Sequence, residues 1–353
     1  MHIGNAQDAG DKFLSCGIQC LSCDYPIHFD TYKGCSHACK YCFVKQKYDI
    51  SNIQPMHTTK SLRNFIEGKR NFETKWCDWA IPLHWGGNSD PFQACELEHK
   101  CSLECLEIFA ETKYPFIVST KNPVMLTKEP YLSLISQCRC VLQVSMGCGK
   151  YDKLEQGAPT YEERLQAVKL LSDKVTRIIA RVRPYFPDCH KDIVKELPRY
   201  AEAGVYGISI SSFISKKKQK GMKRYGSSYL FDFDLLMPRF KEIARVCHEN
   251  CMRFFCCESG LDHWSDDLTC CGTEGLDDFK PNRYTLSQIA YFPDTAIPTE
   301  AMKAKGTTRP FRSIRQSQAW ELHIKDKSFV DMMDECDNGY VRWLQDMQRK
   351  YGD

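Results

Sequence analysis

Three cysteines in a short stretch are the residues of this sequence with the clearest chemistry. Cys35, Cys39 and Cys42 are spaced C-x3-C-x2-C within residues 34–43. Three thiolates can bind three irons of a 4Fe–4S cluster and leave the fourth iron open to a small chelating ligand. Zinc would need a fourth ligand, for which His37 is the nearest candidate. The spacing therefore predicts an iron–sulfur site, with a zinc site or three buried thiols as the alternatives.

The composition is that of an ordinary globular protein. The chain has 353 residues, 42% of them hydrophobic, and a net charge of +3, which neither requires nor excludes nucleic acid. No apolar run reaches the length of a membrane span, and the N-terminus lacks an apolar signal core. We therefore expect a cytoplasmic protein with no membrane partner, in which the 21 cysteines are reduced thiols or metal ligands.

A second set of cysteines has the same spacing. Cys16, Cys20 and Cys23 also form C-x3-C-x2-C, but Ser22 precedes the last of them and no strand-like run leads into the set. By contrast, the predicted strand Ile27–Lys33 leads directly to Cys35. We therefore assign the main cluster to the later set. An auxiliary iron–sulfur cluster, a zinc ion and free thiols all stay open for the earlier set.

The elements that must position these cysteines alternate between strands and helices. The predicted strands are Ile27–Lys33, Trp79–Trp85, Phe116–Thr120, Cys140–Met146, Thr176–Val182 and Val205–Ser211. The predicted helices between them are Thr59–Lys69, Glu96–Thr112, Leu126–Gln137, Tyr161–Leu171 and Lys191–Ala203, the fourth preceded by a capping box at Thr160. This alternation predicts a parallel sheet with right-handed crossovers, in a partial (β/α)6 barrel. Such barrels carry their chemistry at the carboxyl ends of the strands, and the cysteine motif follows the first strand.

The aromatic Tyr41 before the third cysteine completes a pattern that resembles the radical SAM superfamily. Further stretches resemble its spore photoproduct lyase-like branch, often labelled DNA repair photolyases. They are residues 86–92, 119–123, 144–145, 154–165 and 181–184, within a region of resemblance from residue 27 to about 215. The resemblance implies a 4Fe–4S cluster on Cys35, Cys39 and Cys42, bound S-adenosylmethionine (SAM), and a reductant such as flavodoxin or ferredoxin. It also implies cleavage of SAM to a 5′-deoxyadenosyl radical that abstracts hydrogen from a substrate.

The resemblance also implies the residues that hold SAM. Gly86 and Gly87 correspond to the glycine-rich turn that binds the methionine amino group, where glycine allows close backbone approach. The other implied contacts are Ser89 as a polar contact to SAM, Lys121 to the methionine carboxylate, Ser145 to the carboxylate or ribose hydroxyls, and Arg181 to SAM or an anionic substrate. No side chain is assigned a catalytic role, and the stretch Gly157–Pro159 is interpreted as structural.

One departure limits the carry-over of function. Spore photoproduct lyase has a hydrogen-donating cysteine where this chain has Gly87, so its thiol step is not expected here. The branch favours a nucleic acid or nucleotide as substrate, and a peptide or small metabolite is the enzymatic alternative. A non-catalytic zinc or redox-sensing module is the alternative from another class.

The C-terminal third carries two further candidate sites. The run Lys216–Arg224 has six basic residues and no acid, which suits a phosphate backbone or a solvated loop. The second candidate site is a group of five cysteines that are near His263 in the sequence. These cysteines could form an auxiliary iron–sulfur site, a zinc site or part of the core. They are Cys251, Cys256, Cys257, Cys270 and Cys271. We expect three segments: an N-terminal segment 1–26, a barrel 27–215, and a cysteine-rich extension 216–353 that ends in a helix, Phe329–Tyr351.

Overall fold

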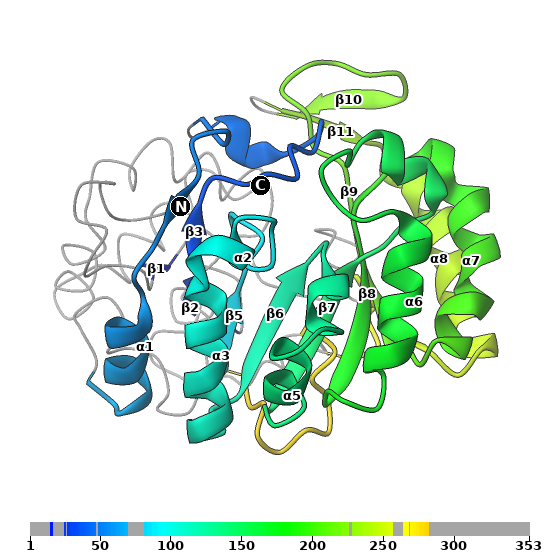
Figure 1. Cartoon of the computed structure of the whole chain (residues 1–353). Coiled ribbons are helices and arrows are strands. Elements are labelled where there is room, and N and C mark those ends of the chain that lie inside the picture. The colour runs from blue at the N-terminus through cyan, green and yellow to red at the C-terminus, as the bar shows by residue number, and fades with distance from the viewer. Residues whose placement is uncertain are drawn as a thin grey trace, which may run out of the picture.

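The central feature of the fold is one curved sheet (Figure 1). The computed structural model describes residues 15–16, 25, 27–46, 49–69, 81–225, 228–256, 264–267 and 269–281. Within these residues the strand order is β1-β2-β5-β6-β7-β8-β9-β12, and all neighbours are parallel except β1, which pairs antiparallel with β2. The strands are β1 Ser15–Cys16, β2 Ile27–Phe29, β5 Leu83–Trp85, β6 Phe116–Thr120, β7 Cys140–Ser145, β8 Arg177–Tyr185, β9 Gly207–Ser212 and β12 Arg253–Cys256. The predicted partial barrel is confirmed.

The sequence missed one parallel strand. Each predicted strand has a counterpart in the sheet, although Tyr32–Lys33 at the end of the first one pair with Gln54–Pro55 in a separate two-stranded sheet. In addition, β12 pairs parallel with β9. Its residues Arg253–Cys256 lie inside the stretch that the sequence assigned to a cysteine cluster. The sheet therefore continues past residue 215, where the barrel was expected to end. The division of the chain into three segments stays a prediction.

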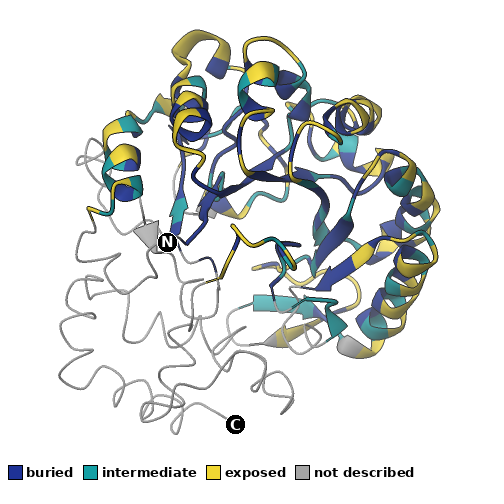
Figure 2. Ribbon diagram, turned by 90° about the horizontal axis from the view of Figure 1, so that it is seen from below, coloured by how far each residue is buried: buried dark blue, intermediate teal, exposed yellow. Residues whose placement is uncertain are grey.

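Helices cover the outer face of the curved sheet, as the view along the strands shows (Figure 2). They are α1 Thr59–Ile66, α2 Glu96–His99, α3 Cys101–Thr112, α4 Pro123–Leu126, α5 Tyr131–Ile135, α6 Tyr161–Leu171, α7 His190–Glu202 and α8 Phe233–Glu249. The capping box at Thr160 is present: its side chain accepts from the backbone N–H of Glu163, and the Glu163 carboxylate accepts from the N–H of Thr160. The predicted helix Glu96–Thr112 is divided in two at Lys100, which has a left-handed backbone with φ of 55°.

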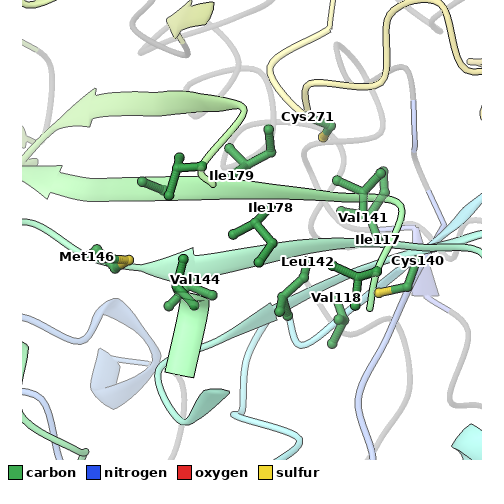
Figure 3. Packing of buried hydrophobic residues seen from close by; sticks show 14 of the residues in the cluster. Ile117, Val118, Cys140, Val141, Leu142, Val144, Met146, Ile178, Ile179 and Cys271 are labelled. Atoms are coloured by element: carbon green, nitrogen blue, oxygen red, sulfur yellow. The ribbon is translucent and has the colours of Figure 1, made fainter. Parts of the chain in front are cut away.

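The core lies between the sheet and these helices. Trp85 of β5 and Phe116 of β6 both pack on Phe109 of α3, with ring centroids 5.9 and 4.0 Å apart. Branched residues of β6, β7 and β8 continue this packing (Figure 3). Because side chains alternate between the two faces of a strand, the same strands direct their other residues toward the barrel interior.

Residues 269–279, here called the floor segment, close the barrel at the amino ends of the strands. Arg177, at the start of β8, donates hydrogen bonds to the carbonyls of Gly272 and Glu274 at 3.1 and 2.6 Å. Tyr25, just before β2, contacts the Thr273 hydroxyl at 2.7 Å and donates to the Phe279 carbonyl at 2.6 Å. The floor segment therefore lies at the opposite end of the sheet from the carboxyl ends of the strands.

The structure places part of the second predicted cysteine site in the core. Cys256 in β12 and Cys271 in the floor segment are 1% and 2% exposed, and both belong to the hydrophobic core, in which Figure 3 labels Cys271. Cys251 is exposed and Cys270 half-buried. Cys16 lies in β1 beside Ile27. Cys20, Cys23, Cys257, His263 and the predicted helix Phe329–Tyr351 lie outside the described residues, so an auxiliary metal site stays a prediction.

None of the helices that the structure describes is long and apolar enough to cross a membrane.

Candidate active site

The loop of Cys35, Cys39 and Cys42, here called the cluster loop, lies at the carboxyl end of the sheet. It follows β3 (Tyr32–Lys33), which pairs with β4 (Gln54–Pro55). Gly34 has φ of +88°, and a Cβ there would lie 2.7 Å from the Asn52 carbonyl oxygen, so glycine is required at this position. Cys39 is buried, Cys35 and Cys42 are half-buried, and all three are free thiols.

Burial keeps two of these thiols protonated at neutral pH. It raises the pKa of Cys35 to about 12 and that of Cys39 to about 11, and the nearby Lys121 ammonium opposes the shift at Cys39. Metal ions bind thiolates rather than thiols, so loading this loop with metal must release protons.

His37 is already engaged by the protein. Its Nδ1 lies 2.8 Å from the carbonyl oxygen of Gly157, and its Nε2 lies 3.1 Å from a carboxylate oxygen of Asp90. With both ring nitrogens occupied, His37 does not supply the fourth ligand that a zinc ion on the cluster loop would need. The residues that the structure describes contain no group of three His, Cys, Asp or Glu side chains compact enough for a single metal ion. The three thiols of the cluster loop match the number of protein ligands of a cubane with one open iron.

The glycine-rich turn after β5 is fixed by Asp30, a residue that the sequence did not single out. Asp30 accepts hydrogen bonds from the N–H groups of Asn88 and Ser89, each at 3.0 Å, and from the Ser89 hydroxyl at 3.3 Å. Gly86 has φ of +86°, and a Cβ there would lie 2.5 Å from the Ser119 carbonyl oxygen. A Cβ on Gly87 would meet the His28 ring at 3.3 Å. The turn is thus held against the ends of β2 and β6.

Asp90 joins this turn to the cluster loop. Its carboxylate accepts from the Thr120 hydroxyl at 2.7 Å and from the Lys121 N–H at 2.6 Å, in addition to its contact with His37. Burial alone would raise the pKa of Asp90, but the interactions with His37, the Lys121 N–H and Thr120 lower it below its ordinary value. Asp90 is therefore a buried carboxylate held ionised by its neighbours.

The remaining predicted SAM residues lie at the ends of β6, β7 and β8. The Lys121 ammonium lies 3.3 Å from Glu155 and 5.6 Å from the centre of the Tyr41 ring. Ser145 is the register partner of Arg181. Arg181 donates to the Ser119 hydroxyl at 2.5 Å, on the inner face of the sheet. The structure thus brings the cluster loop and the predicted SAM residues to one end of the sheet, and their roles in binding stay predictions.

Segment 154–157 contributes to the same end of the sheet, and its last residue opens the stretch Gly157–Pro159 that the sequence analysis interpreted as structural. The Lys40 N–H donates to the Leu154 carbonyl at 2.8 Å, and the Gly157 N–H donates to the His37 carbonyl at 3.3 Å. The sequence signal was present, because these residues open one of the stretches that carry the family resemblance. Their contact with residues about 120 positions earlier, as in the bond from His37 to Gly157, could only be seen in the fold.

Comparison of the sequence with known proteins gives distant relatives. Uncharacterized proteins of Mycobacterium tuberculosis and Mycobacterium bovis are 24% identical over 190 residues, which cover 51% of this chain and 56% of theirs. The chain thus spans about half the length of the curated relatives it matches. No family model matches the sequence.

Comparison of the fold gives a clearer answer. A spore photoproduct lyase variant with bound AdoMet and dinucleoside spore photoproduct aligns with a TM-score of 0.52 and 14% identity, over 66% of this chain and 76% of the lyase. A second lyase variant, with dinucleoside spore photoproduct, aligns with the same TM-score over 69% of this chain and 78% of the lyase. This fold match agrees with the resemblance carried by the sequence motifs. The chain thus has the partial-barrel fold of spore photoproduct lyase.

Proposed function

We propose that this protein is a radical SAM enzyme. The observation that carries the proposal is the cluster loop with three free thiols, placed beside a glycine turn at the carboxyl end of a partial barrel. When bound, a reduced 4Fe–4S cluster supplies the electron that cleaves SAM to methionine and a 5′-deoxyadenosyl radical. The chain supplies the binding site: Cys35, Cys39 and Cys42 hold the cluster.

The proposed SAM contacts are those that the resemblance implies for the residues at the strand ends. Gly86 and Gly87 leave room for the methionine amino group, and Ser89 contacts SAM. Lys121 is proposed to bind the methionine carboxylate, and Ser145 the carboxylate or the ribose hydroxyls. Arg181 is proposed to bind SAM or an anionic substrate. This arrangement holds SAM next to the cluster and keeps the reacting carbon away from water.

For the substrate we favour a nucleic acid or nucleotide. Spore photoproduct lyase, with the same fold, binds a dinucleoside photoproduct. In this chain the basic run of residues 216–224 leads into a hairpin of β10 (Met222–Tyr225) and β11 (Ser228–Phe231), at the same end as the cluster loop (Figure 1). Four exposed lysines precede the hairpin, and such a surface suits a phosphate backbone.

The test of the proposed function is anaerobic reconstitution with iron and sulfide, followed by iron quantitation and an assay for 5′-deoxyadenosine. A cubane contributes about four irons per chain, and a second, auxiliary cluster would raise the content to about eight. Cleavage of SAM by the iron-loaded protein supports the proposal. A protein that takes up zinc but no iron, or takes up iron without cleaving SAM, contradicts it.

The Asp30→Asn variant is expected to weaken SAM binding by at least about tenfold, because an amide cannot accept all the hydrogen bonds that fix the glycine turn. SAM affinity is measured by equilibrium dialysis on iron-loaded protein of matched iron content. The control is Asp173→Asn, which alters an exposed carboxylate paired with Lys174. Unchanged affinity in the Asp30 variant would show that the turn does not hold SAM.

Replacing Lys216, Lys217, Lys218 and Lys220 with glutamine is expected to weaken binding of single- or double-stranded oligonucleotides. The slope of log affinity against log salt should fall by about 0.7 to 0.9 for each phosphate that the variant no longer neutralises. A matched control replaces four exposed lysines on the outer helices, Lys60, Lys169, Lys191 and Lys195. If both variants bind like the parent, substrate is to be sought among peptides and small metabolites.

A further inference from the structure

Glu155 lies at the junction of the cluster loop and two strand ends. It sits between the helical turn of residues 149–153 and α6, and its side chain is 2% exposed. One carboxylate oxygen accepts the Tyr41 hydroxyl and lies 3.3 Å from the Lys121 ammonium. The other lies 2.5 Å from the guanidinium of Arg164. Both oxygens of this buried carboxylate are therefore used within the protein.

The partners of Glu155 belong to different parts of the site. Tyr41 immediately precedes the cluster-loop residue Cys42, and Lys121 follows the last residue of β6. Arg164, in the first turn of α6, also donates to the carbonyl of Ser145 at the end of β7, at 2.8 Å. A single carboxylate thus connects the cluster loop to the ends of β6 and β7.

Backbone hydrogen bonds on either side of Glu155 also attach the cluster loop to segment 154–157. The Leu154 carbonyl accepts from Lys40 at 2.8 Å, and Gly157 bonds His37 through both its N–H and its carbonyl, at 3.3 and 2.8 Å. The cluster loop therefore takes its place from a segment more than a hundred residues later in the chain, not only from its own turn residues.

The contacts at this junction depend on the negative charge of Glu155. The carboxylate is flanked by two cations, Lys121 and Arg164, whose side chains are 15% and 3% exposed. Removing its charge would leave these two largely buried cations close together without the carboxylate that both of them contact. Breaking a buried pair in this way is strongly unfavourable, so the local structure must rearrange.

We propose that Glu155 is a positioning residue, which sets the cluster loop against the ends of β6 and β7. This inference rests on the proposed function. It gives Lys121 a second role besides binding SAM, because its ammonium contacts Glu155 and lies 5.6 Å from the centre of the Tyr41 ring. The geometry predicts that weakening the contacts of Glu155 with Tyr41, Lys121 and Arg164 displaces the cluster cysteines relative to the SAM residues, although every cysteine and every SAM residue is still present.

The experiment compares Glu155→Gln, Tyr41→Phe and the double variant with the parent protein. The first measurement needs no metal: the rate of iodoacetamide labelling of Cys42 in the metal-free chain, read by mass spectrometry. Glu155→Gln should raise this rate by about tenfold or more, and Tyr41→Phe by about threefold, because a loosened loop opens more often. The double variant should equal Glu155→Gln, because the Tyr41 hydroxyl acts through Glu155.

The second measurement uses iron-loaded protein. We expect Glu155→Gln to hold less iron and to lose the change that SAM causes in the electron paramagnetic resonance spectrum of the reduced cluster. The matched control is Glu162→Gln. Glu162 lies on α6, as Arg164 does, and forms an exposed ion pair with Arg199 of α7. It should behave as the parent in both measurements.

The outcomes separate this inference from the proposed function. If the parent binds iron and cleaves SAM while Glu155→Gln matches it in labelling, iron content and spectrum, Glu155 is not a positioning residue. If Glu155→Gln does not fold, the Tyr41→Phe variant tests the inference instead. A Cys42 labelling rate and a resonance spectrum equal to those of the parent in that variant would overturn the inference. If the parent binds no iron, the proposed function fails, and the labelling rates still judge the link between Glu155 and the loop.

Discussion

A Cys35/Cys39/Cys42 triple alanine variant is expected to lose about four irons per chain and all formation of 5′-deoxyadenosine. Each of these thiols is free, and together they are the only donors that we assign to the main cluster. With no thiolate on the loop, no cubane can be held there. Anaerobic reconstitution, iron quantitation and the SAM cleavage assay on the same samples measure both losses.

The control for this variant removes three cysteines that belong to neither predicted metal set. Cys95, Cys101 and Cys138 lie on or beside the outer helices and are free thiols. Their triple alanine variant should keep the iron content and SAM cleavage of the parent. A cluster-loop variant that keeps about four irons after losing cleavage would locate an auxiliary cluster in the other cysteines. A variant that still cleaves SAM would overturn the assignment of the loop.

Gly157→Ala is expected to displace the cluster loop. A Cβ at this position would lie 2.3 Å from the Ser36 carbonyl oxygen and 2.8 Å from the His37 Cα, so backbone atoms of the loop must move. Overpacking of this kind lowers the free energy of unfolding by about 1–3 kcal/mol. Here the atoms that must move belong to the contacts that hold the cluster loop in place. We expect less than half of the parental iron content and a lower thermal midpoint.

Gly149→Ala is the matched control. A Cβ at Gly149 would meet no atom within 4 Å, and the residue lies only eight positions before Gly157. Iron content and thermal midpoint of this control should equal those of the parent. If Gly157→Ala also matches the parent, segment 154–157 does not position the cluster loop.

Local patterns were sufficient to predict most of the barrel. Runs such as Phe116–Thr120 and Cys140–Ser145 are buried along nearly their whole length, so their apolar sequences mark them as strands of a parallel sheet. The Thr160 capping box fixed the start of α6 to the residue. In contrast, β12 has four residues and ends in a cysteine, and its neighbouring cysteines gave it the composition of a metal site. Burial, which places Cys256 and Cys271 in the core, is not visible in the sequence.

The predicted ligands of the candidate site come from local patterns, whereas the side chains that support them do not. The spacing of Cys35, Cys39 and Cys42 is local, and so is the turn of Gly86 and Gly87. Asp30 reaches Ser89 across 59 positions, and Tyr41 reaches Glu155 across 114. Contacts over such separations depend on which strands become neighbours, so one sequence could not reveal them.

The floor segment has a consequence for the order in which the chain is completed. Tyr25 and Thr273 are 248 positions apart, so the amino end of the barrel cannot close until nearly the whole described chain has been synthesised. At about 5–20 residues per second, the cluster loop leaves the ribosome roughly 10 to 50 seconds before the residues that close the barrel beneath it. Its thiols pass that interval on an unfinished barrel.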